Sequence, residues 1–128
     1  MTDVITTTLL IAAGFATRYD ADVMERSYQN HLRMGHVTPC PECVGRVALL
    51  DCSRLDDRVW LRVDGEWTGP IHVTDCAAGH DRDGLEKRRW AVDLSWPLAK
   101  LFGVIDNIRH GFEVWAARPD VGLGRLVR

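Results

Sequence analysis

Two aspartates stand at the ends of apolar, β-rich runs of the sequence: Asp75 in "IHVTDC" and Asp93 in "WAVDLSW". Four apolar neighbours would partly desolvate Asp93: Trp90, Val92, Leu94 and Trp96. Burial raises the pKa of a carboxyl group toward the range of a proton donor. If Asp75 lies in the same groove, the two carboxylates push each other's pKa values apart. A protonated acid beside an ionised partner is an arrangement suited to general acid–base catalysis.

These aspartates also have a simpler interpretation. Short polar side chains at strand ends often accept hydrogen bonds from the backbone N–H groups of turns, and this role stays open for Asp75 and Asp93. Asp20 and Asp22, in "TRYDAD", are candidates for substrate contact or for a catalytic base. Helix capping is the simpler account of Asp22, because Asp is strongly preferred at helix N-termini.

Aromatic residues and histidines supply further candidate substrate contacts. Tyr19, Trp67 and Trp90 could contact a substrate through their aromatic faces. Packing in the core is the alternative for each of them. His80, in the polar loop "AAGHDRDGLEKRR", is a candidate for proton transfer or substrate contact, with a solvated loop side chain as the alternative. His31, beside a predicted helix face, is a weaker candidate.

The four cysteines leave three states open. A CxxC pair, Cys40 and Cys43, followed by Cys52 and Cys76 could form a tetrahedral structural zinc site, although the second pair is widely split. Two disulfides are favoured if the domain is exported, and free buried thiols are the third state. Catalytic zinc is not expected, because no histidine has the spacing of a partner ligand. No cofactor is therefore predicted apart from the structural zinc alternative.

The elements that must position these residues are mostly strands. Strand-rich runs at short spacing, without an alternation of strands and helices, indicate a small barrel or sandwich. The runs predict strands over 9–19, 46–52, 58–63, 69–76, 90–94 and 111–119, with a break at Gly14 and turn-like segments at 53–57 and 64–69.

Two helices are predicted between these strands. The first places Met24, Tyr28 and Leu32 at helical spacing after an N-cap at Asp20 or Asp22. The second follows Ser95, a favoured N-cap residue, and carries a proline in its first turn. Its inward-facing residues are expected to be Leu98, Leu101 and Phe102.

Length and charge bound the classes of partner. The chain of 128 residues has the length of one domain, spanning residues 1–128, and has enough apolar residues to form a core. The net charge of −2 comes from interspersed acids and bases, so there is no basic stripe for nucleic acid and no polybasic cluster for a membrane surface. Neither partner is predicted, and we expect a monomer.

The first residues carry no recognisable export signal. The run "TTTLLIAAGFA" is too short to span a membrane, and Asp3 ahead of it has the wrong charge for a signal peptide. Two localisations stay open: a cytoplasmic or phage-encoded protein, or a secreted or cell-envelope domain whose signal lies upstream.

Four stretches of the chain resemble a known family. "GFATRY", "IHVTDCAAG", "AVDLSWPLAKLFG" and "GFEVWAARP" are similar, in order and rough spacing, to the double-psi β-barrel of expansins, family-45 glycoside hydrolases and rare lipoprotein A. The matching motif positions are Thr17, Tyr19, Thr74, Asp75 and Asp93 to Ser95. Ala91 and Val92 stand where expansins have "HF", and this form of the motif is more similar to that of rare lipoprotein A.

The resemblance implies a fold and an activity. The fold is a six-stranded double-psi β-barrel with Asp75 and Asp93 opening onto one groove, and Asp93 matches the general acid of family-45 hydrolases. Asp20 and Asp22 do not align with the base of those enzymes. The implied ligand is a cell-wall glycan, peptidoglycan before cellulose, and the implied reaction is that of a lytic transglycosylase. Thr17 would then contact the glycan, and the aromatic faces of Tyr19, Trp67 and Trp90 could stack on the apolar C–H faces of its sugar rings. A non-catalytic expansin-like carbohydrate-binding module and a protein-interaction module are the alternatives. Expansin-type barrels often carry disulfides.

Overall fold

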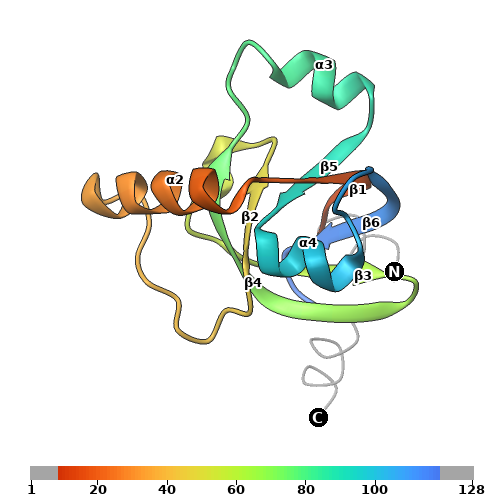
Figure 1. The fold of residues 1–128 in the computed structure, drawn as a ribbon, viewed down its shortest axis with the longest axis horizontal. Coiled ribbons are helices and arrows are strands. Elements are labelled where there is room, and N and C mark those ends of the chain that lie inside the picture. The colour runs from red at the N-terminus through yellow and green to blue at the C-terminus, as the bar shows by residue number, and fades with distance from the viewer. Residues whose placement is uncertain (1–8, 119–128) are drawn as a thin grey trace.

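Six strands form a closed barrel in the computed structural model, which describes residues 9–118 (Figure 1). The strands are β1 (Leu10–Arg18), β2 (Arg46–Leu49), β3 (Arg58–Val63), β4 (Glu66–Cys76), β5 (Trp90–Leu94) and β6 (Arg109–Trp115). Around the barrel they follow the order β1-β5-β2-β4-β3-β6. The predicted mostly-β, six-stranded barrel is thus confirmed. Residue 119, which the last predicted strand included, lies outside the described residues.

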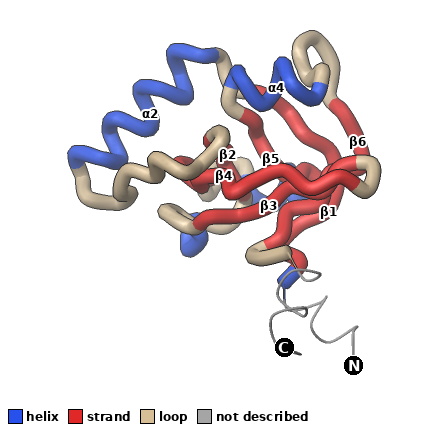
Figure 2. The backbone as a smooth tube through the Cα atoms, turned by 90° about the horizontal axis from the view of Figure 1, so that it is seen from below, coloured by secondary structure: helices blue, strands red, loops and turns tan. Residues whose placement is uncertain are grey.

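The barrel is mixed. The pairs β1–β5 and β2–β4 are parallel, and the other four neighbouring pairs are antiparallel. Parallel strands need long crossover connections. The chain from β2 to β4 passes through β3, and the chain from β1 to β5 passes through α2 (Ala21–Arg33) and three strands. Figure 2 shows α2 and α4 (Trp96–Phe102) outside the wall of strands. This topology is compatible with a double-psi barrel.

Alternating side chains fill the barrel. Along β3, Val59, Leu61 and Val63 are buried while the residues between them are more exposed, as the pleat of a strand requires. Phe112 of β6 is fully buried, and burial of such a side chain contributes about 2–3 kcal/mol. The same core contains Val47, Leu49, Ile71, Val73, Val92, Leu94 and Val114.

Helix α2 packs one face against the barrel. Met24 and Tyr28, four residues apart, are its buried residues. The helix begins after Asp20, whose backbone carbonyl accepts hydrogen bonds from the Val23 and Met24 N–H groups. The Asp20 carboxylate does not cap the helix, because it is paired with Arg18 at 2.6 Å.

Helix α4 differs from the prediction in the face that it buries. It begins after Ser95 and ends at Gly103, which has a φ of 72°. Leu98 and Ala99 are its buried residues, whereas Leu101 is 67% exposed, so the expected inward position of Leu101 is wrong. At 100° per residue, a face centred on Leu98 and Ala99 turns Leu101 toward solvent.

Two further segments depart from the sequence-based expectation. Helix α3 (Arg82–Lys87) forms within the predicted polar loop, and none of its residues is fully buried. The turn predicted over 64–69 is confined to Asp64 and Gly65, both at positive φ, so β4 starts earlier than expected. Within residues 9–118, no helix combines the length and apolar character needed to cross a membrane.

Candidate functional site

Four residues lie in register across four adjacent strands. Asp93 of β5 pairs with Thr17 of β1 on one side and with Ala48 of β2 on the other. Ala48 pairs in turn with Asp75 of β4. Paired residues on neighbouring strands point to the same face of a sheet, so the two carboxyl groups share a face. One strand separates them, which places their Cα atoms about 10 Å apart.

A cavity of about 800 Å³ opens beside Asp93. Its wall includes Thr17, Tyr19 and Trp90, so three predicted substrate contacts surround the predicted acid. Ala48 also lines it, and its single methyl group leaves room that a larger side chain would fill. The volume lies within the usual range of small-ligand sites. Other wall residues are Phe15, Cys76, Asp81, Leu85, Arg88 and His110.

The environment of Asp93 favours its protonated form. Burial raises the pKa of Asp93 from its ordinary value of 3.8 to about 7, with a smaller contribution from the charge of Asp75. The Thr17 hydroxyl and the Arg18 guanidinium act in the opposite direction. Within the described chain, the buried Asp93 Oδ1 has no hydrogen-bond partner. Asp93 therefore carries a proton over much of the range below neutral pH.

Asp75 has the opposite character. Burial alone would raise the pKa of Asp75, but its hydrogen bonds outweigh burial and lower it. Oδ2 accepts from Tyr19 Oη at 2.7 Å and from Ser27 Oγ at 2.7 Å, and Oδ1 accepts from the Cys76 N–H at 2.9 Å. His31 Nε2 lies 3.4 Å from Oδ1. The two aspartates thus separate into a protonated and an ionised carboxyl group.

Tyr19 connects Asp75 to the cavity. Its ring lines the cavity, while its hydroxyl donates to Asp75, which is not among the lining residues. Burial and the Asp75 carboxylate raise the pKa of Tyr19 well above its ordinary value, so the phenol stays a donor. On the other side of Asp93, Trp90 Nε1 donates to Thr17 Oγ1 at 2.8 Å. Trp90 is only 6% exposed, so packing accounts for most of its surface.

The remaining predicted contacts lie apart from this cavity. Asp20 and Asp22 are exposed at the start of α2, where Asp20 pairs with Arg18. His80 is exposed and lies 3.4 Å from the Asp81 carboxylate. Trp67, near the start of β4, packs edge-on against Trp115 and lines a different hollow. The structure does not bring these four predicted contacts to the Asp93 cavity.

Sequence reasoning missed Ser27 as a partner of Asp75 and gave little weight to His31. Both lie on α2, and the chain between α2 and β4 gives no sign that the helix crosses the end of that strand. Their spacing of four residues puts them on one helix face, which is the signal that could have linked them. Arg88 and His110, at the cavity wall, were missed because residues around α3 and β6 fold back over the site.

The cysteines form two disulfides, Cys40–Cys43 and Cys52–Cys76. The favoured prediction of two disulfides is thus confirmed, and a four-cysteine zinc site and free thiols are both excluded in this state. Cys52–Cys76 ties the short 3-10 turn Cys52–Arg54 to the end of β4, directly after Asp75. Cys76 also lines the cavity, so this bond supports the site.

Tyr19→Phe is expected to destabilise the protein by about 1–3 kcal/mol at pH 7, because the charged form of Asp75 loses a partly buried hydrogen-bond donor. The lowered pKa of Asp75 contributes stability above its ordinary value of 3.8, and this contribution is lost as the pH falls through the folded value. The penalty should therefore shrink in acid. Urea unfolding at pH 7 and pH 2.5 measures it, with Tyr28→Phe as the control. A penalty that is unchanged at both pH values contradicts the assigned hydrogen bond.

Comparisons with known proteins identify no relative of this chain. No protein-family model, curated protein or solved structure matches the chain. The resemblance described above therefore depends on the motif residues and on the closed, mixed barrel that carries them. The function has to be argued from the geometry of the cavity.

Proposed function

We propose that this domain acts on a cell-wall glycan, as a peptidoglycan lytic transglycosylase of the rare lipoprotein A type with Asp93 as the general acid. The observation that carries the proposal is the Asp93 carboxyl group in the wall of a cavity of about 800 Å³, with its pKa raised to about 7 by burial. Such a group holds a proton that it can deliver to a glycosidic oxygen near neutral pH. The double-psi assignment belongs to the same proposal.

The wall of the cavity suits a sugar ring. Phe15, Tyr19 and Trp90 supply apolar surface, and Arg88 and His110 supply polar groups at the same cavity. Aromatic side chains complement the C–H face of a pyranose, and a few polar groups fix its orientation. The two disulfides are typical of an oxidising compartment, which supports a secreted or cell-envelope location.

The state of Asp75 favours transglycosylation over hydrolysis. Both of its oxygens are occupied by donors, so it is poorly placed to activate a water molecule at the anomeric carbon. In the proposed reaction, Asp93 protonates the glycosidic oxygen as its bond to the anomeric carbon breaks, and a hydroxyl of the same sugar attacks that carbon. The proton of that hydroxyl returns to Asp93. Asp75 then acts as a positioning residue, because it orients Tyr19 at the cavity wall.

A non-catalytic, expansin-like module is the second candidate. The observation that favours it is again that both oxygens of Asp75 accept hydrogen bonds from the protein. Asp93 then has no free carboxylate beside it to act as the second catalytic group. In this case the cavity binds glycan and no bond is broken.

Mass spectrometry of purified sacculi after incubation separates these functions. We expect anhydro-sugar ends, which a lytic transglycosylase leaves, and their loss in Asp93→Asn. Asp75→Asn should reduce turnover less. Reducing ends would indicate a hydrolase, and intact glycan with retained binding would indicate the expansin-like module. Absence of binding to both sacculi and cellulose would refute the glycan proposal, and anhydro products undiminished in Asp93→Asn would refute the role of that residue.

A further inference from the structure

The Cys40–Cys43 disulfide lies away from the Asp93 cavity, in the surface loop between α2 and β2. We propose that this disulfide opens reversibly by exchange with a dithiol, and that the two thiols then bind a thiophilic divalent cation such as Zn²⁺ together with Glu42. The loop is thus a redox-gated metal site, independent of the proposed glycan chemistry.

Three ligand atoms converge in this loop. The two Sγ atoms and a Glu42 carboxylate oxygen all lie within 4.8 Å of one another. Glu42 Oε1 lies 2.6 Å from Cys40 Sγ, next to the disulfide bond. The backbone turn is closed by a hydrogen bond from the Cys43 N–H to the Cys40 carbonyl. A CxxC turn is a common half of a tetrahedral zinc site, and a carboxylate is an accepted third ligand.

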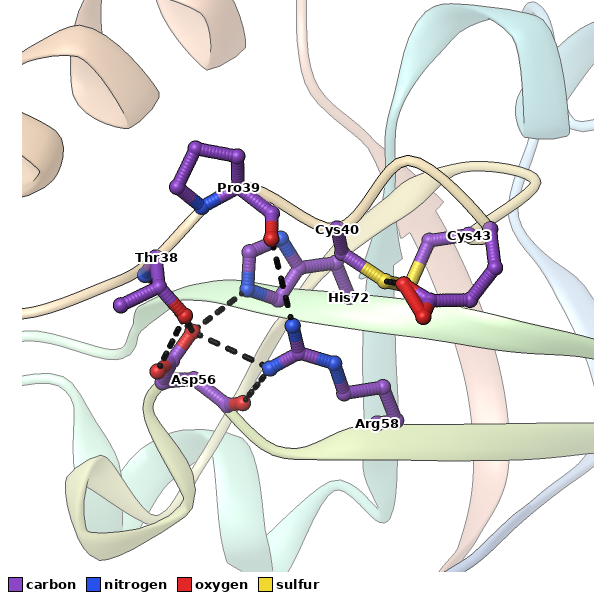
Figure 3. Close-up of polar contacts among 8 residues, drawn as sticks. Thr38, Pro39, Cys40, Cys43, Asp56, Arg58 and His72 are labelled. Carbon is purple, nitrogen blue, oxygen red and sulfur yellow. Dashed lines mark hydrogen bonds and ion pairs between the residues drawn. A yellow bond between two sulfur atoms is a disulfide. The ribbon is translucent and has the colours of Figure 1, made fainter.

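The loop is held on both sides by contacts that do not involve sulfur. On one side, Asp56 accepts a hydrogen bond from the Thr38 N–H, and Arg58 donates to the Pro39 carbonyl (Figure 3). On the other side, the Val44 N–H donates to a backbone carbonyl of β4. Opening the disulfide therefore leaves Cys40 and Cys43 close together, which is the condition for reversible closure and for chelation.

The anchor at Asp56 is itself fixed to the barrel. His72 of β4 is buried, and its Nε2 lies 2.8 Å from Asp56 Oδ1 (Figure 3). Arg58 also donates to the Asp56 carbonyl at 2.7 Å. Burial would raise the pKa of Asp56, but hydrogen bonds from Thr38 and His72 lower it, so the anchor stays ionised. The ligand loop is thereby tied to a part of the fold that the redox step leaves intact.

The chemistry balances with a dithiol as the reductant. One thiolate of the dithiol attacks a sulfur of the Cys40–Cys43 bond, which breaks and gives a mixed disulfide and one free cysteine thiolate. The second thiol of the reductant then displaces the remaining cysteine and leaves as its own cyclic disulfide. Two electrons pass to the protein, and both cysteines take up protons. Binding of a divalent cation releases these two protons, because thiolates are the ligands.

The other disulfide should resist the same reductant. Cys52 and Cys76 are 24 residues apart, whereas Cys40 and Cys43 are three apart. The fold stabilises a disulfide by as much as the disulfide stabilises the fold, and this mutual effect grows with the length of the closed loop. The folded state therefore stabilises the Cys40–Cys43 bond less than the Cys52–Cys76 bond, and Cys40–Cys43 should be reduced first.

Graded reduction with dithiothreitol tests the first step. The folded protein is alkylated at increasing reductant concentration and mapped by peptide mass spectrometry. We expect Cys40 and Cys43 to be labelled while Cys52 and Cys76 stay unlabelled, and removal of the reductant in air to restore the original bond. Prior or simultaneous labelling of Cys52 and Cys76 would overturn the proposal.

Cobalt and zinc titrations of the selectively reduced protein test the second step. Reduced protein should bind one Co²⁺ per chain with a thiolate-to-cobalt absorption band, and Zn²⁺ should displace it. Binding should be lost in Cys43→Ser and in the oxidised protein, and weakened in Glu42→Gln, with the exposed Glu66→Gln as the matched control. Absence of the band in the reduced protein, or equal affinity in the oxidised form, would overturn the metal site. Equal affinity in Glu42→Gln and Glu66→Gln would remove Glu42 as a ligand and overturn the proposed ligand set.

Discussion

Asp93→Asn is expected to increase the free energy of unfolding by roughly 4 kcal/mol at pH 8 and by little at pH 4. The pKa of Asp93 is raised from 3.8 to about 7, so its proton stabilises the folded protein at low pH, and this stability is lost as the pH rises through about 7. A neutral amide of the same shape avoids that loss. The stated magnitude is the difference between the two pKa values converted to free energy.

Urea unfolding from pH 4 to pH 8 measures this effect. The difference between variant and wild type should grow between about pH 4 and pH 7 and then level off. Asp83→Asn, which replaces an exposed carboxylate on α3, is the matched control and should leave the profile unchanged. A stability difference that is constant with pH would show that Asp93 is ionised throughout.

The same variant links stability to the proposed activity. If Asp93 is the acid, glycan cleavage by the wild type should decline as the pH rises above about 7, where the group loses its proton. Asp93→Asn should lose the cleavage while becoming more stable. Gain of stability with loss of turnover is characteristic of a buried ionisable group retained for chemistry.

Replacement of Cys52 and Cys76 together by Ser is expected to cost about 3 kcal/mol of unfolding free energy, because the bond closes a loop of 24 residues. The Cys40 and Cys43 double replacement is the control, and it should cost less, since its loop is far shorter. Urea unfolding under non-reducing conditions compares the two. Equal losses would contradict the loop-length argument.

The first double variant should also disturb the cavity. Cys76 directly follows Asp75 and its N–H donates to that carboxylate, so a freed end of β4 weakens the fixed geometry around Asp75. Weaker glycan binding by this variant, with unchanged binding by the Cys40 and Cys43 control, is the expected functional result.

Local sequence patterns predicted the barrel and the character of Asp93. Period-two alternation in β3 and apolar runs elsewhere indicate strands without knowledge of their partners. Of the four residues expected to desolvate Asp93, Trp90, Val92 and Leu94 are buried and Trp96 is partly buried. The desolvation of the carboxyl group was therefore readable from its neighbours. The choice between disulfides, zinc and free thiols depended on which cysteines meet in space.

What the sequence could not predict depends on contacts between distant segments. The side-chain donors to Asp75 come from α2 and from Tyr19, which directly follows β1, up to 56 residues away, and no local pattern pairs Tyr19 or Ser27 with it. Leu101 was misplaced because a seven-residue helix offers two plausible apolar faces, and only packing on the barrel selects one. Trp67 was placed with the sugar contacts on residue type alone, whereas the strand order puts it against Trp115.

The strand order has a consequence for how the protein reaches its native state. Of the six strands in residues 9–118, only β3 and β4 are neighbours both along the chain and around the barrel. Closure of the barrel pairs Leu10 of β1 with Trp115 of β6, at opposite ends of the described chain. Most strand pairs therefore lose much chain entropy by closing a long loop before their contacts form. Such topologies fold in milliseconds to seconds. Because the register from Thr17 to Asp75 exists only after β1 docks on β5 and β2 on β4, the cavity should appear in refolding experiments together with barrel closure and in no earlier intermediate.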